Sequence, residues 1–165
     1  MIVLGIDPGM AETGFGVVRS AGSRFRALSH GVISTPPGDP AEQRLAEIQR
    51  EVAALIGAHE PDALAIEDLY VGRNPRTVLL VGQARGAVMA ACGQAGVPVA
   101  AYAPAEIKTA VCGFGRAEKS QVAQMVSAIL GLAQPPHTTH AADALAVAIC
   151  HSQRGRRNPP TELAG

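Results

Sequence analysis

The sequence is poor in aromatic residues, cysteine and charged side chains. It has no Trp, and its aromatic residues make up 3% of the chain. Its three cysteines, Cys92, Cys112 and Cys150, match neither a disulfide framework nor a zinc-binding spacing. No apolar run reaches about 18 residues, and no basic stretch precedes the short apolar start, so neither a membrane span nor a signal peptide is expected. Together these absences favour a protein of the reducing cytoplasm.

A formal net charge of zero argues against a strongly basic nucleic-acid-binding protein. The charges are nevertheless unevenly distributed along the chain. Residues 1–68 contain five Arg or Lys and ten Asp or Glu, whereas residues 69–165 contain nine and four. A basic surface beside an acidic site is compatible with a phosphodiester substrate. Ordinary scatter of surface charge is the alternative explanation.

The chain has 165 residues, of which 47% are hydrophobic and 17% charged, as expected for an ordered globular protein. We predict one domain over residues 1–152, followed by a mobile tail over 153–165 that lacks core residues. Apolar patterns and turn residues predict five strands (2–7, 14–19, 25–34, 63–67 and 97–101) and five helices (41–59, 77–92, 104–111, 117–130 and 140–152).

The order of these elements indicates the fold class. Three strands at hairpin spacing, followed by alternating helices and strands, predict an α/β fold. We expect a mixed sheet in which three antiparallel N-terminal strands are joined by parallel strands, with helices on both faces. Functional sites of open α/β sheets gather beyond the ends of the strands.

Four residues stand out as candidate metal ligands at such positions. Asp7 ends the first apolar run, and Glu67 ends the fourth predicted strand. If those strands are parallel and adjacent, the two carboxylates meet. His140 and Asp143 are three residues apart on one face of the last helix. Three carboxylates and an imidazole favour hard divalent cations such as Mg²⁺ or Mn²⁺, and two such ions can promote phosphodiester hydrolysis.

Each candidate also has a structural explanation that needs no metal. Asp7 precedes Pro-Gly and is a typical turn residue. Glu67 can be a solvated carboxylate at a strand end, and His140 can face solvent in the first turn of its helix. Asp143 can complement the helix dipole. No single one of these residues therefore decides the question.

Taken in order, five motifs are specific. They are Gly5-Ile6-Asp7-Pro8-Gly9 with Thr13-Gly14-Phe15-Gly16, Ala65-Ile66-Glu67, Gly82-Gln83-Ala84-Arg85-Gly86, Ala117-Glu118-Lys119-Ser120-Gln121-Val122 and His140-Ala141-Ala142-Asp143-Ala144-Leu145-Ala146. Their order and spacing over residues 1–152 resemble the bacterial crossover junction endonucleases of the RuvC family, the Holliday-junction resolvases.

The resemblance implies a ribonuclease-H-like fold and a homodimer that makes paired, symmetric, metal-dependent nicks in four-way DNA junctions during recombination and repair. It also implies a partnership with the RuvA–RuvB branch-migration complex. Asp7, Glu67, His140 and Asp143 fall on the family's catalytic positions. The third position is often Asp in the family. Because His140 lowers the negative charge there, a preference for Mn²⁺ is expected.

The resemblance also implies DNA contacts. Lys108 and Lys119 fall on basic positions that the family uses against DNA. The positive charge of Lys119 opposes the dipole of its helix, which indicates an external anion. A plain surface lysine is the alternative explanation. Tyr70 falls where the family usually has a stacking Phe; packing on its own loop is the alternative. Further candidates for phosphate contacts are Arg73, Arg76 and Arg116.

The small residues of the helix over 77–92 allow close approach of another backbone. The family dimerises through this region, which places Val81, Ala84, Ala87 and Ala91 at the predicted dimer interface. Packing on the sheet within one subunit explains the same spacing.

Three other functions remain open from the sequence. They are a non-catalytic junction-binding module, a less specific metal nuclease and an actin-like nucleotide-binding ATPase. The ATPase shares a strand-Asp-glycine start but usually needs two related domains, for which the chain leaves little room.

Overall fold

The computed structural model describes residues 1–69 and 74–157, except for the side chains of 156 and 157. Five strands form one sheet in the order β3-β2-β1-β4-β5. The strands are β1 (Ile2–Asp7), β2 (Glu12–Ala21), β3 (Arg24–Ser34), β4 (Ala63–Glu67) and β5 (Val99–Tyr102). β1, β2 and β3 are antiparallel neighbours, whereas β4 pairs in parallel with both β1 and β5. The predicted mixed sheet is therefore confirmed.

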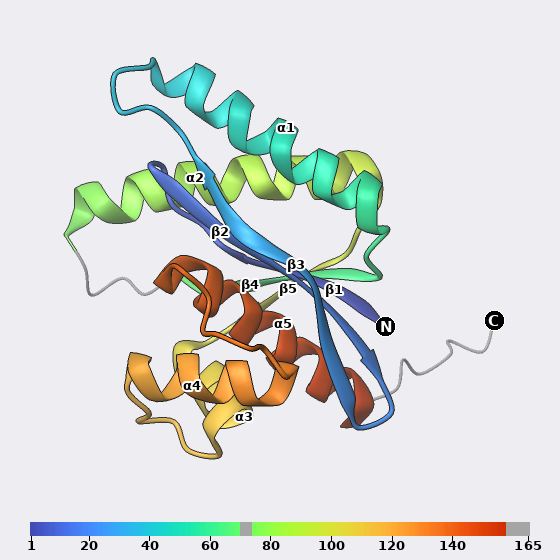
Figure 1. The fold of residues 1–165 in the computed structure, drawn as a ribbon. Helices are drawn as coiled ribbons and strands as arrows, with labels where there is room; N and C mark the ends of the chain where they lie inside the picture. The colour runs from blue at the N-terminus through green and yellow to red at the C-terminus, as the bar shows by residue number, and fades with distance from the viewer. Residues whose placement is uncertain (70–73, 158–165) are drawn as a thin grey trace.

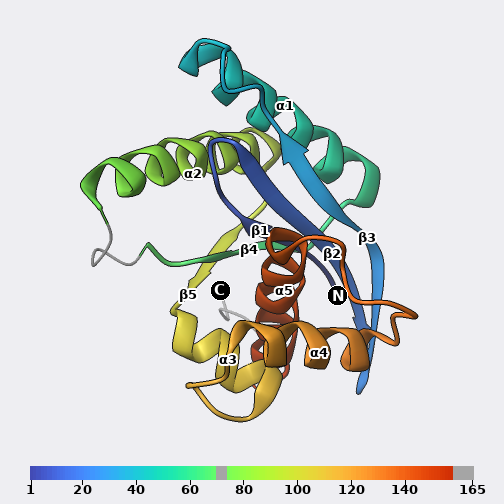
Figure 2. The ribbon, with the colours of Figure 1, turned by 60° about the vertical axis from the view of Figure 1, so that its left-hand side comes forward.

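Within the described ranges, five helices cover the two faces of this sheet (Figures 1 and 2). They are α1 (Ala41–His59), α2 (Pro75–Ala95), α3 (Pro104–Cys112), α4 (Lys119–Leu130) and α5 (Thr139–Arg157). α1 and α2 cover one face, and α3, α4 and α5 lie on the other (Figure 1). Each face has its own hydrophobic cluster. Among the described helices, none combines the length and the apolar character needed to cross a membrane.

β1 lies at the centre of the sheet because its sequence is almost continuously apolar. Val3, Leu4 and Ile6 have no exposed surface, and they divide between the two hydrophobic clusters. A strand buried on both faces requires an apolar residue at nearly every position. The same reasoning explains β4, in which Leu64 and Ile66 face one cluster and Ala65 faces the other.

α5 packs on β1 and β2 at very short range because glycines lie beneath it. A Cβ atom on Gly5 would lie 2.0 Å from the main-chain oxygen of Ala144, and one on Gly14 would lie 2.1 Å from that of His140. At Gly16 the nearest atoms would belong to the Leu145 side chain, at 2.7 Å. The helix therefore contacts the strand backbones directly, and its first turn is placed against the ends of β1 and β2.

Several elements extend beyond the predicted bounds. β2 begins at Glu12 instead of residue 14, and α2 spans Pro75–Ala95 instead of 77–92. Asn74 caps α2 by accepting a hydrogen bond from the Arg76 N–H at 2.9 Å, and Pro at the first position suits a helix start. α5 extends to Arg157, five residues beyond the predicted end of the helix and of the domain. Residues 158–165 lie outside the described residues.

Candidate functional site

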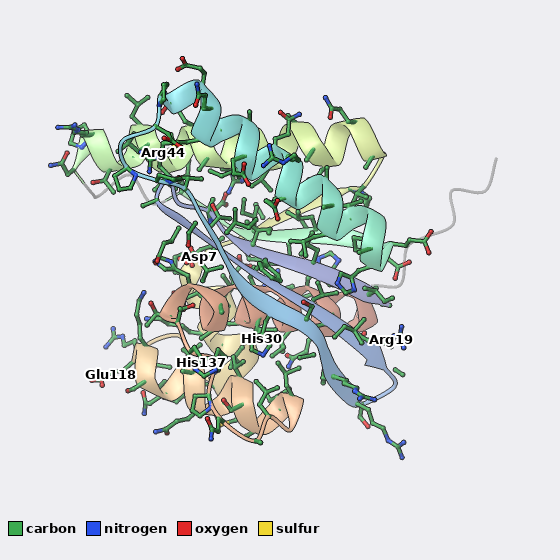
Figure 3. All side chains as sticks on the ribbon, turned by 45° about the horizontal axis from the view of Figure 1, so that its top comes forward. Asp7, Arg19, His30, Arg44, Glu118 and His137 are labelled. Carbon is green, nitrogen blue, oxygen red and sulfur yellow. The ribbon has the colours of Figure 1, made fainter. Side chains whose placement is uncertain are left out.

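The candidate site lies at the carboxyl ends of two parallel strands. Asp7 is the last residue of β1 and Glu67 the last of β4, and the parallel register that pairs Ile6 with Ile66 brings these ends together. Figure 3 shows Asp7 at this end of the sheet, between the two helical layers. A cavity of about 480 Å³ opens there. Asp7, Glu67, His140 and Asp143 all line it, together with Lys108 and Lys119.

The chain reverses direction immediately after Asp7. The hydroxyl of Thr13 donates a hydrogen bond to the Gly9 carbonyl oxygen at 2.8 Å, and its oxygen accepts one from the Gly9 N–H at 3.3 Å. Thr13 is completely buried. This closed turn holds the start of β2 beside the end of β1 and keeps the Asp7 side chain directed into the cavity.

The N-terminal part of α5 supplies the other two candidate ligands, His140 and Asp143. The Thr138 side chain caps the helix by accepting a hydrogen bond from the Ala141 N–H at 3.1 Å. His140 Nδ1 lies 2.7 Å from Asp7 Oδ2, within hydrogen-bond distance. On its other side, His140 Nε2 lies 3.5 Å from Glu12 Oε2. The imidazole therefore sits between two carboxylates, one at the end of β1 and one at the start of β2.

Lys119 reaches the same site from the N-terminus of α4. Its Nζ atom lies 3.2 Å from Asp143 Oδ2, although 71% of the side chain is exposed. The helix start is fixed by a hydrogen bond from the Glu118 N–H to Gln121 Oε1 at 2.9 Å. A carboxylate of the same chain thus offsets the unfavourable position of Lys119 in the helix dipole.

The electrostatics of Asp7 reflect its partial burial. Desolvation raises the pKa of Asp7 above 3.8, and the nearby charge of Asp143 acts in the same direction. The hydrogen bond with His140 and the charge of Lys119 lower the pKa of Asp7 and so oppose these effects. A cation bound between Asp7 and Asp143 would relieve their repulsion. The chemistry of the site therefore favours a positive ion.

The residues present fit a hard divalent metal by donor type and by their shared cavity, but not by their present side-chain positions. Within the described ranges, no three of the His, Cys, Asp and Glu side chains are grouped so that they could hold one ion. Instead, Asp7 is paired with His140 and Asp143 with Lys119. These pairs use carboxylate oxygens that a metal would take, so binding an ion requires the side chains to reorient.

The predicted DNA-binding residues have different locations. Lys108, on α3, is half-buried and lines the cavity. Arg76 is exposed in the first turn of α2, and Arg116 is exposed shortly before α4. Tyr70 and Arg73 lie outside the described residues. The structure thus brings Lys108 and Lys119 into the candidate site and leaves Arg76 and Arg116 on the surface.

The four residues predicted for a dimer interface divide into two groups. Ala84 and Ala91 are 0% and 1% exposed in the single chain, where they belong to the core between α2 and the sheet. For these two residues, packing within one subunit is the correct explanation of the small side chains, because a buried residue offers no surface to a second copy. Val81 and Ala87 are half-buried, and Leu79 and Met89 are exposed on the same helix.

The sequence did not single out two residues that the structure places at the site. Glu12 follows the turn after Asp7, and nothing in its surroundings distinguishes it from a surface carboxylate. Arg85 is on α2, and its Nη1 atom donates a hydrogen bond to the Glu67 carbonyl oxygen at 2.8 Å. The available signal for Arg85 was a charged side chain in the middle of a helix whose neighbouring residues are mostly small or apolar.

Comparison with known sequences gives a consistent result. The family model described as crossover junction endodeoxyribonuclease RuvC matches residues 3–151. The crossover junction endodeoxyribonuclease RuvC of Syntrophomonas wolfei is 50% identical over 151 residues, which cover 92% of this chain and 88% of that protein. The protein of the same description from Moorella thermoacetica is 47% identical over 166 residues, covering 100% and 99% of the two chains.

Solved structures extend the similarity to three dimensions. The structure of Thermus thermophilus RuvC matches with a TM-score of 0.89 at 41% identity, covering 95% of this chain and 96% of that one. The structure of the same protein in complex with a Holliday junction substrate matches with a TM-score of 0.91 at the same identity and coverage. The yeast mitochondrial Holliday junction resolvase Ydc2, at 14% identity and a TM-score of 0.63, shares the fold.

Proposed function

Because the chain belongs to the crossover junction endodeoxyribonuclease RuvC family, we propose that it resolves Holliday junctions with the cavity at the ends of β1 and β4. The family's activity is hydrolysis of DNA, and the ribonuclease-H-like fold is that of the matching structures. An actin-like ATPase and a non-catalytic junction-binding module are not favoured, since the relatives are endodeoxyribonucleases.

One observation supports this assignment of the site most directly. Three carboxylates and one imidazole, carried by β1, β4 and α5, line a single cavity together with two lysines. Acidic residues alone would repel a phosphodiester, and lysines alone would bind it without promoting its hydrolysis. Their combination suits a site that holds cations and receives a phosphate between them.

The family is metal-dependent, and we assign Asp7, Glu67, His140 and Asp143 as the residues that hold two Mg²⁺ or Mn²⁺ ions. Such ions, when bound, supply an activated water and neutralise the charge that develops on the leaving oxygen. Asp7 is the central member of this set because it ends the middle strand of the sheet and already contacts His140. Glu67 faces it from the neighbouring strand.

The two lysines bind and orient the substrate in this proposal. Lys119 is paired with Asp143 in the free protein, and its largely exposed side chain can turn toward a phosphate once Asp143 has another cation. Lys108, half-buried on α3, offers a second positive charge at the wall of the cavity. We assign Arg76 and Arg116, both exposed, to contacts with phosphates farther from the cut.

The wider assembly is also part of the proposal. A four-way junction has paired strands of like polarity, so two copies of this chain related by symmetry would make the two matched nicks. Val81 and Ala87, with the exposed apolar residues of α2, are the proposed dimer surface. We assign the RuvA–RuvB branch-migration complex as the partner and the cytoplasm, where chromosomal junctions form in bacteria, as the place of action.

The decisive experiment compares a mobile four-way junction with a linear duplex of the same sequence, in Mg²⁺, Mn²⁺ or chelator. We expect paired, symmetric nicks in the junction alone, lost in chelator. Asp7→Asn should abolish cleavage and leave junction binding largely intact. Equal cutting of the linear duplex would instead indicate a less specific nuclease. Junction binding without nicking in either metal would indicate a binding module and would remove the proposed role of the four ligands.

A further inference from the structure

Arg85 makes an unusual contact with the strand that carries Glu67. Its side chain is only 15% exposed, and Nη1 donates a 2.8 Å hydrogen bond to the Glu67 main-chain oxygen. Nη2 lies 3.5 Å from Asp68 Oδ1. A guanidinium that has given up most of its water must gain from its contacts in the protein. Here those contacts are with two consecutive residues at the end of β4.

On the β1 side, the residue in line with the Glu67 carbonyl has no N–H to donate. The parallel ladder between β1 and β4 runs from Val3 and Ala63 to Ile6 and Ile66 and then stops. In a parallel ladder, each carbonyl oxygen accepts a hydrogen bond from the N–H of the residue one beyond its partner. On β1, the position that would donate to the Glu67 oxygen is therefore residue 8. Residue 8 is Pro, which has no N–H.

The alternation of hydrogen bonds along β4 supports this geometry. The N–H of Leu64 donates to the Pro98 oxygen at 2.9 Å, and that of Asp68 donates to the Tyr102 oxygen at 2.8 Å. These two residues therefore direct their main-chain groups toward β5. Glu67 lies between them in the alternation, so its carbonyl is directed toward β1, where Pro8 has no N–H to continue the ladder. Arg85 supplies that donor from α2.

We propose that Arg85 is a positioning residue that replaces the missing Pro8 N–H and so holds the Glu67 carboxylate at the metal site. The planar guanidinium bonds the Glu67 carbonyl and pairs with Asp68 at the same time, which fixes both the position and the direction of the strand end. This inference rests on the proposed assignment of Glu67 as a metal ligand. It also links α2, which carries the proposed dimer surface, to the end of β4.

Arg85→Met tests the proposal by removing the donors while keeping an unbranched side chain. Loss of a residue that orients a metal ligand typically costs about 10–100-fold in metal affinity or activity. We expect Mn²⁺ affinity of the DNA-free protein, measured by calorimetry, and the single-turnover rate of junction cleavage both to fall by about that factor. Junction binding in chelator should stay within about threefold of the unmodified protein. Unchanged Mn²⁺ affinity and cleavage rate would overturn the proposal.

Arg50→Met is the matched control, because Arg50 lies on α1 and forms an ion pair with Glu47 of the same helix. It should leave Mn²⁺ affinity and cleavage unchanged. If Arg85→Met is too unstable to measure, Arg85→Lys retains one donor and a charge. Lys cannot make both contacts in the same plane, so a smaller loss in the same two quantities is expected. No loss with Arg85→Lys at matched thermal stability would also count against the proposal.

A rescue experiment separates positioning from general stabilisation. Pro8→Ala restores an N–H at residue 8, which can bond the Glu67 carbonyl as the next step of the ladder. In an Arg85→Met background, Pro8→Ala should recover at least about threefold in Mn²⁺ affinity, as expected when two groups serve one acceptor. If the double variant lost as much Mn²⁺ affinity as the two single variants together, the claim that Arg85 replaces this N–H would be overturned.

Glu67→Gln, measured alongside, separates this inference from the assignment on which it depends. If Glu67→Gln leaves Mn²⁺ affinity unchanged, Glu67 is not a ligand, and the proposed site itself fails. If Glu67→Gln weakens Mn²⁺ binding while Arg85→Met does not, the site stands and the positioning role of Arg85 fails. If both weaken it and Pro8→Ala rescues Arg85→Met, both inferences hold.

Discussion

Replacing Gly14 by Ala should separate cleavage from folding. A Cβ atom there would lie 2.1 Å from the main-chain oxygen of His140 and 2.3 Å from its carbonyl carbon. Real Cβ contacts are essentially never shorter than 3.0 Å. The first turn of α5 must therefore move away from β2 by about 0.9 Å, because the opposing atoms belong to the backbone and no change of rotamer can remove the overlap.

That displacement acts directly on the candidate site. His140 Nδ1 lies 2.7 Å from Asp7 Oδ2, and a shift of about 0.9 Å would stretch this contact to about 3.6 Å, beyond a hydrogen bond. A misplacement of about 1 Å in a catalytic arrangement can cost about 10²-fold in rate. Overpacking of this kind costs about 1–3 kcal/mol of folding free energy, which a domain with about 5–15 kcal/mol can tolerate. The variant should therefore fold and cleave poorly.

The assay is single-turnover cleavage of a four-way junction, with urea unfolding of the same preparations. Gly57→Ala is the matched control, since Gly57 lies in α1 with open space around its would-be Cβ atom. It should raise stability by up to about 1 kcal/mol and leave cleavage unchanged. If Gly14→Ala cleaved at the normal rate with unchanged stability, the close packing of α5 on β2 would not be what positions His140.

Three further predictions concern charged groups. Asp7→Asn should keep or raise the thermal midpoint while abolishing cleavage. Burial raises the pKa of Asp7, so the ionised side chain destabilises the folded chain. Differential scanning calorimetry provides the check. Lys119→Met should slow cleavage by about 10-fold or more and lower the salt dependence of junction binding by about one phosphate contact, as measured by titration at several salt concentrations. Burial lowers the pKa of His151 below 6.5, so the folded chain binds this proton less readily than the unfolded chain. The free energy of unfolding should then fall as the pH drops below about 6.5, and urea unfolding at pH 7.5 and about 5.5 should show a smaller fall for His151→Gln.

The sequence predicted those parts of the molecule that depend on local patterns. Asp7 and Glu67 each end an apolar run, and two parallel strands place such residues side by side. The spacing of His140 and Asp143 puts both on one face of a helix, whatever that helix packs against. These patterns explain why the mixed sheet and the shared cavity could be expected, while the assignment of the four residues to metal remains a proposal.

Contacts between distant segments could not be predicted in the same way. The contacts Arg85–Glu67 and Lys119–Asp143 join residues that are 18 and 24 positions apart in the sequence. Each contact depends on how a helix is placed on the sheet. Helix ends show the same limit. α5 continues past residue 152 although its apolar pattern has ended, and Arg154 Nη2 pairs with Glu106 Oε1 on α3 at 2.6 Å. The sequence alone does not predict this ion pair, because it does not show that α3 and α5 are neighbours.

α5 is the element on which the whole site depends. Its N-terminal part supplies His140 and Asp143, and its contact with β1 and β2 is set by three glycines. Its other side supports α3 and α4, which supply Lys108 and Lys119. Groups that hold cations and groups that bind phosphate therefore share one support. A displacement of α5 changes the distances within both sets at once, whereas a displacement of Arg85 on α2 acts on the end of β4. Substitutions beneath α5 should thus impair metal binding and DNA positioning together, whereas substitutions at Arg85 should impair metal binding, and cleavage with it, and leave junction binding intact.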